Sequence, residues 1–161
     1  MEGGRARKPL LQNGIQPQIS PNGRWMAYTS KESGQNQICV RPFPEVNEGR
    51  WQISTSAGDS PLWSRDGREL FYRNGDAVMA VSVKTDPSFS FDAPRTLFQG
   101  KYVSLTTKIQ DLQLSPWDVS GDGRFVMMKE AGGIASPAAS PRKINVVLNW
   151  FEELKQRVPK K

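Results

Sequence analysis

Few residues of this chain could carry catalysis, because none of its 161 residues is a histidine. Without histidine the chain can build neither a Ser-His-Asp nor a Cys-His nucleophilic site, and the usual zinc ligand sets cannot form. Four acidic residues in expected loops remain, and a carbohydrate-active enzyme could use such residues as an acid pair: Glu45, Glu48, Asp59 and Asp118. None stands in a recognisable motif. We therefore expect no catalysis, no metal and no cofactor.

The composition indicates many short strands joined by turns. The chain has 12 prolines and 14 glycines, and long helix-forming runs are scarce, so a helical bundle is not expected. Its single cysteine, Cys39, excludes an intramolecular disulfide. Because Cys39 stands between Ile38 and Val40 in an apolar strand, we interpret it as a buried thiol.

The formal charge of +6 is concentrated at the two ends of the chain. Residues 1–8 contribute +2 and residues 151–161 another +2, which leaves a nearly neutral body. This distribution does not favour nucleic-acid binding. No apolar run approaches about 18 residues, and the first 20 residues lack the apolar centre of a signal peptide. We therefore expect no membrane association and a cytoplasmic location for the chain as written.

One short pattern occurs three times, in the form Ser-x-Asx-Gly-Arg. It covers residues 20–24, 64–68 and 120–124, with glycines 44 and 56 residues apart. An Asx-Gly pair between apolar runs predicts a hairpin with a type I′ turn, in which both central residues have positive φ. The turn pairs could also be interpreted as metal ligands, but we favour structural turns at Asn22, Gly23, Asp66, Gly67, Asp122 and Gly123.

The strands around each turn repeat as well. The strand after the turn is apolar at successive positions (residues 25–28, 70–72 and 125–128), which predicts burial on both faces. The strand before it places Ile19, Trp63 and Val119 at one equivalent position. A third strand (37–40, 78–83, 144–148) and, in two repeats, a fourth (50–53, 95–98) follow. Four antiparallel strands per about 44 residues predict β-propeller blades.

These repeats resemble the TolB-type β-propeller repeats, relatives of the WD-repeat class. The resemblance rests on Ser-x-Asp-Gly-Arg followed by Leu70-Phe71-Tyr72, with Pro61-Leu62-Trp63 before the turn. The stretches 28–30, 40–44 and 144–154 also resemble the last three blades of longer bacterial propeller proteins. The resemblance implies an all-β propeller that binds proteins, and some relatives are periplasmic.

The strand count is out of phase with the blades. We expect blade one at residues 15–54, blade two at 60–99 and blade three at 115–149, the last without its outer strand. Asn149 and Glu152 form a capping-box pattern that predicts a short helix over 150–158. At the other end, residues 7–12 stand where an outer strand of a preceding blade would be.

Three blades cannot close a ring, and open apolar faces favour aggregation. We therefore expect a homodimer that forms a six-bladed ring. In it, residues 7–12 of each chain complete blade three of the other, with contacts from Pro9, Leu10 and Leu11 to Val146 and Leu148. Another closed ring, or a truncated gene fragment without a settled function, is the alternative.

The expected binding site lies at the channel mouth, where the innermost strands begin. Its candidate residues are Gln16, Gln18, Asp59, Ser60, Trp117 and Asp118. The leading hypothesis is a non-catalytic binding module whose partner is a protein, a peptide or a small polar ligand. The alternative is a carbohydrate-active propeller enzyme that uses carboxylates at this mouth.

Overall fold

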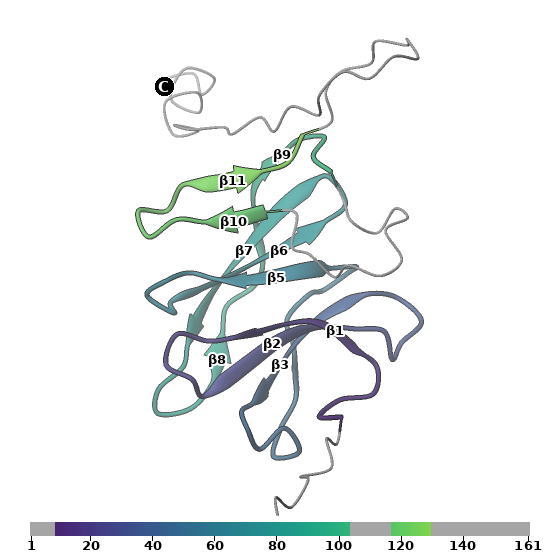
Figure 1. Cartoon of the computed structure of the whole chain (residues 1–161), viewed down its shortest axis with the longest axis vertical. Helices are drawn as coiled ribbons and strands as arrows, with labels where there is room; N and C mark the ends of the chain where they lie inside the picture. Colours follow the sequence, from purple (N-terminus) through teal and green to yellow (C-terminus); the bar gives the residue numbers. More distant parts are fainter. Residues whose placement is uncertain (1–8, 104–116, 130–161) are drawn as a thin grey trace, which may run out of the picture.

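A computed structural model describes residues 9–103 and 117–129 of the chain. The described part is all-β, contains no helix, and forms three antiparallel sheets (Figure 1). Sheet 1 contains β1 (Gly14–Ile19), β2 (Trp25–Ser30), β3 (Gln37–Pro42) and β4 (Trp51–Gln52). Sheet 2 contains β5 (Asp59–Trp63), β6 (Glu69–Asn74), β7 (Ala77–Lys84), β8 (Ser90–Phe91) and β9 (Arg95–Gln99). Sheet 3 contains β10 (Trp117–Val119) and β11 (Phe125–Met127).

Sheets 1 and 2 are meanders in which strands adjacent in the sequence pair with each other. Sheet 1 has the expected four strands in the order β1-β2-β3-β4. Sheet 2 differs from the expected four strands, because two short strands share the outer edge of β7. β9 pairs with residues 77–80 and β8 with residues 83 and 84. The chain folds back directly after β7, which creates the additional strand β8.

The three Ser-x-Asx-Gly-Arg segments form the tight turns between the first and second strands of the sheets. Only the glycines have positive φ, at 72°, 70° and 80° for Gly23, Gly67 and Gly123. The type I′ geometry expected from the sequence is therefore wrong, because it requires positive φ at the Asx residue too. The Asx side chain instead accepts a hydrogen bond from the serine hydroxyl at the start of each turn. In the first two turns the Asx oxygen also accepts from the backbone N–H of the arginine two residues on, which is the contact that defines an Asx turn.

Side chains between the sheets form two apolar layers, and the sheets stack one on another along the molecule (Figure 1). Between sheets 1 and 2, the rings of Trp25 and Phe89 lie with their centroids 5.0 Å apart, and the Trp51 ring is 5.3 Å from Phe89. Between sheets 2 and 3, Phe71 meets the edge of Phe125 at 5.1 Å. Sheet 2 lies between the two layers, which explains why β6 is buried on both faces. The outer face of β2 is covered instead by Val46, Leu11 and Phe43.

The third repeat departs from this pattern at β11. Phe125 and Met127 are buried against sheet 2, but Val126 is 37% exposed, so the expected burial on both faces is wrong for this strand. The third hairpin has one residue fewer between the equivalent paired positions, since Val119 pairs with Phe125 whereas Trp63 pairs with Leu70. A shift of one residue turns every side chain of a strand to the opposite face.

Several expectations concern residues outside the described part, namely the third strand of blade three with Val146 and Leu148, and the helix over 150–158. The structure describes residues 9–12 of the expected exchanged strand, and these residues form no strand within their own chain. Pro9 and Leu10 are exposed, and Leu11 packs beside Met26 and Tyr28. Among the described residues, no helix is long and apolar enough to cross a membrane.

Candidate functional site

The first strands of the three sheets, β1, β5 and β10, carry the six residues expected at the channel mouth. A chain of hydrogen bonds connects four of them. The Gln16 Nε2 donates to Ser60 Oγ at 3.1 Å, and Ser60 Oγ donates to Asp59 Oδ1 at 2.9 Å. The indole Nε1 of Trp117 donates to the carbonyl oxygen of Ser60 at 3.2 Å. The structure therefore brings Gln16, Asp59, Ser60 and Trp117 together along the inner edge of the stacked sheets.

The other two candidates contribute less to this inner-edge cluster. Gln18 offers its backbone carbonyl, which accepts a hydrogen bond of 3.0 Å from the indole of Trp63. Asp118 is exposed and accepts a hydrogen bond from the backbone of Val119. Asp118 and Trp117 point to opposite faces of β10, so the Asp118 carboxylate points away from the cluster.

Gln16 and Ser60 occupy the same position in consecutive repeats, and both have a left-handed backbone. Their φ values are 53° and 54°, and each lies within a break in strand register. Such conformations of non-glycine residues cost about 1–3 kcal/mol and cluster at functional sites. The sequence contains a signal for these bulges, because Pro17 and Pro61 follow directly. Proline within a sheet is confined to edges and bulges.

Sequence reasoning missed Arg73, which lies on β6 directly opposite Asp59 of β5 in the strand pairing. The Arg73 side chain is buried, with 3% of its surface exposed. Its Nη2 donates to the carbonyl of Gly75 at 2.7 Å, and its guanidinium lies 5.7 Å from the ring centre of Tyr102. Within the described part of the chain, Nε and Nη1 have no acceptor. The signal was an arginine that directly follows the doubly buried Leu70-Phe71-Tyr72 run.

Burial shifts the pKa values of Asp59 and Arg73 in the directions that favour their neutral forms. The pKa of the Asp59 carboxyl is raised by desolvation, which the Ser60 hydrogen bond and the charge of Arg73 partly oppose. The pKa of Arg73 is lowered by desolvation, which the charges of Asp59 and Asp76 oppose. Buried charges are costly unless they are compensated, so this end of the cluster is electrostatically strained.

Two of the four candidate acidic residues, Glu45 and Glu48, lie apart from Asp59. Glu45 and Glu48 are exposed in the loop after β3, beside the turn of Arg24, whose carbonyl accepts from the backbone of Phe43. Asp59 lies at the opposite end of β5 from the turn that follows that strand. A strand of this length spans about 16 Å, more than the roughly 5–10 Å between glycosidase carboxylates. No cluster of three metal-ligating residues occurs in the described ranges.

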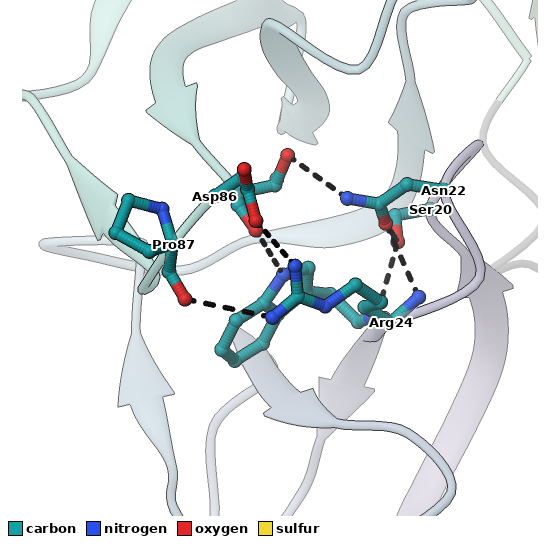
Figure 2. Close-up of polar contacts among 7 residues, drawn as sticks. Ser20, Asn22, Arg24, Asp86 and Pro87 are labelled. Atoms are coloured by element: carbon teal, nitrogen blue, oxygen red, sulfur yellow. Dashed lines mark hydrogen bonds and ion pairs between the residues drawn. The ribbon is translucent and has the colours of Figure 1, made fainter.

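At the turn end of the sheets, the first turn grips a loop of sheet 2 (Figure 2). Arg24 Nη1 pairs with the carboxylate of Asp86 at 2.5 Å, and its Nη2 lies 3.5 Å from the carbonyl of Pro87. Asn22 Nδ2 donates to Thr85 Oγ1 at 3.1 Å, and the Trp25 indole donates to the Thr85 carbonyl at 2.9 Å. We call this set of contacts the turn clasp.

A half-open cleft of about 790 Å³ lies beside the second turn, away from the inner-edge cluster. Its lining combines Arg68 and Lys84 with Asp66, Asp92 and the exposed ring of Phe91. Glu69 and Ser82 also line it, and both share the face of sheet 2 that packs on sheet 3 farther along the strands. The cleft thus continues the sheet 2 to sheet 3 interface toward the turn end.

No protein-family model matches the chain, and no curated protein matches it either. The inner-edge cluster therefore stands on its own geometry: a row of hydrogen-bond donors and acceptors on rigid strands, without a paired nucleophile and base among the described residues.

Proposed function

We propose that this chain is a non-catalytic binding module built as half of a six-bladed β-propeller of the TolB-type repeat class. A second copy completes the ring, and a protein, peptide or small polar ligand binds at the inner-edge cluster. The third sheet becomes a full blade with the strand expected at residues 144–148 and with residues 7–12 of the second copy.

The observation that carries the proposal is a repeated link between first strands. The Trp63 indole donates to the carbonyl of Gln18 on β1, and the Trp117 indole donates to the carbonyl of Ser60 on β5. Each first strand is thereby fixed to the first strand of the preceding sheet. Sheets that stack face to face with their first strands side by side match the arrangement of propeller blades around a channel.

Light scattering of the purified chain tests the ring. The expected mass is twice the 18.0 kDa of one chain. Deletion of residues 1–12 should dissociate this dimer, because it removes the strand that each copy lends to the other. A folded monomer, or a dimer that the deletion leaves intact, contradicts the strand exchange.

Binding at the inner edge is tested by thermal shift with a panel of short peptides and small polar ligands. The ligands that stabilise the protein should lose their effect in Asp59→Asn and Gln16→Glu, two near-isosteric changes within the inner-edge cluster. Glu32→Gln, on an exposed position after β2, is the matched control and should bind normally. Ligands that bind both groups of variants equally would place the binding site elsewhere.

A further inference from the structure

The interface between sheets 1 and 2 and the interface between sheets 2 and 3 are built in the same way. The residue four positions before the turn glycine is buried against the preceding sheet in both cases: Trp63 lies against sheet 1, and Val119 lies against sheet 2. Ile19 occupies the same position in sheet 1, which no described sheet precedes, and it is 42% exposed. The outer face of sheet 1 is therefore the face that receives a preceding sheet elsewhere in the molecule. Here Leu11 and Phe43 pack over Met26 and Tyr28 at its centre, and Ile19 on β1 stays exposed.

Sheet 3 is open on the other side. Val126 is 37% exposed on the face of β11 opposite Phe125 and Met127, which contact sheet 2. In sheets 1 and 2, the face turned toward the next sheet is covered. Sheet 3 thus lacks a following sheet and sheet 1 lacks a preceding one, among the residues that the structure describes.

Where sheet 1 packs on sheet 2, the turn clasp adds polar contacts between the first turn and a loop of sheet 2. In Figure 2, the turn of sheet 1 grips residues 85–87, the loop that follows the third strand of sheet 2. Its central contact joins the arginine after the turn glycine to a carboxylate of the next sheet. The arginine at the same position in the third turn, Arg124, is half exposed and pairs within its own turn with Asp122 at 2.7 Å.

The loop that follows the third strand of sheet 1 corresponds to the clasped loop of sheet 2. Val46 and Phe89 each lie a few residues after a third strand and are buried on the side of the preceding sheet. Val46 packs with Met26 on the outer face of sheet 1, while Phe89 packs with Trp25. This loop carries two exposed carboxylates, Glu45 and Glu48. Glu45 lies nearer the end of its third strand, three residues after Pro42, much as Asp86 lies two residues after Lys84.

We propose that the outer face of sheet 1 in a second copy packs on the Val126 face of sheet 3, and that Arg124 grips the partner's Glu45 loop as Arg24 grips residues 85–87. This inference rests on the proposed ring and names the surfaces that close it. Ile19 of the second copy then lies on the face that carries Val126. Opposite charges face each other across the contact. A two-fold axis repeats the contact, so each substitution acts twice in a dimer.

Charge reversal tests the contact in the full chain. Arg124→Glu and Glu45→Arg should each weaken the dimer roughly tenfold, because each replaces two attractions with two repulsions. The double variant should restore wild-type dissociation, as a direct pair does in a double-mutant cycle. Arg68→Glu changes the equivalent arginine in the second turn, inside the chain, and should leave dimerisation unchanged. Analytical ultracentrifugation gives the dissociation constants, and circular dichroism confirms folding.

The outcomes separate this contact from the ring itself. A wild-type dimer that neither single reversal weakens overturns the Arg124 to Glu45 contact and leaves the ring proposal standing. Single reversals that weaken the dimer without restoration in the double variant show that the two residues meet other groups, which also overturns it. A wild-type chain that is monomeric overturns the ring and the contact together. Ile19→Glu should dissociate the dimer whatever the polar contact does, and an intact dimer would refute the proposed face.

Discussion

Replacement of Gln16 by alanine should loosen sheet 1 from sheet 2. The Gln16 Oε1 accepts hydrogen bonds of 3.0 Å from the backbone N–H of Ser60 and of 3.0 Å from the Thr29 hydroxyl, and Nε2 donates to Ser60 Oγ. Ser60 and Thr29 are buried, with 3% and 0% of their surfaces exposed. Gln16→Ala therefore leaves two buried donors without an acceptor.

The cost follows from these two donors. A buried donor without an acceptor costs about 1–3 kcal/mol, and water that enters the vacated space recovers part of this. We expect a loss of about 2–4 kcal/mol, which in a chain of this size lowers the melting temperature by roughly 5–15 °C. Backbone strain does not contribute to this loss, because alanine keeps the left-handed φ of 53°. Gln16→Gly removes that strain and should recover about 1 kcal/mol relative to Gln16→Ala.

Urea unfolding followed by tryptophan fluorescence measures these differences. Gln18→Ala is the matched control, since Gln18 lies two residues along the same strand and only its backbone carbonyl is hydrogen-bonded. It should lose less than about 1 kcal/mol. If Gln16→Ala is no more destabilising than Gln18→Ala, the hydrogen bonds of Gln16 do not hold the two sheets together, and the reasoning is refuted.

Three further predictions concern titratable groups. Because burial raises the pKa of Asp59 above 3.8, the folded state takes up its proton before the unfolded state does as pH falls. Asp59→Asn should thus be more stable than wild type at pH 7 and lose this advantage by about pH 4 in urea titrations, whereas a constant difference would contradict it. Ser120→Ala should raise the pKa of Asp122 from about 2 toward 3.8 in carboxyl NMR titrations, because the hydrogen bond from the Ser120 hydroxyl is the largest cause of the low pKa. An unchanged pKa would show that Arg124, not Ser120, lowers it. Burial raises the pKa of Cys39, so an aromatic disulfide reagent should react with it only after unfolding, and rapid reaction of the folded protein would show that this strand opens.

Much of the described architecture follows from local sequence patterns. The alternation of apolar runs with Asx-Gly turns predicted the strands of sheets 1 and 2, except β8, to within a few residues, since turn residues and apolar strands are local signals. The all-β class is confirmed for the described part. The turn type was wrong because the serine hydroxyl, a group two residues before the Asx, decides how the Asx side chain is held.

The inner-edge cluster depended on contacts between repeats, which a local pattern does not contain. Gln16 and Ser60 are 44 residues apart, and their contact exists only when two sheets stack. Arg73 follows an apolar run, and nothing in its neighbouring residues indicates Asp59 as its partner across the strands. Burial and pairing of this kind result from tertiary packing, which overrides local propensity.

The arginine after each turn glycine shows how far a repeat determines its contacts. Arg24, Arg68 and Arg124 each end a Ser-x-Asx-Gly-Arg segment. Arg24 and Arg68 donate their backbone N–H to the Asx of their turns in the same way. Their side chains differ: Arg24 reaches Asp86 of the next sheet, Arg68 lines the cleft, and Arg124 returns to Asp122. The sequence therefore determines the turn, while the sheet that follows determines the partner. An arginine that pairs within its own turn at an open face is what this rule predicts for a chain whose next sheet belongs to a second copy.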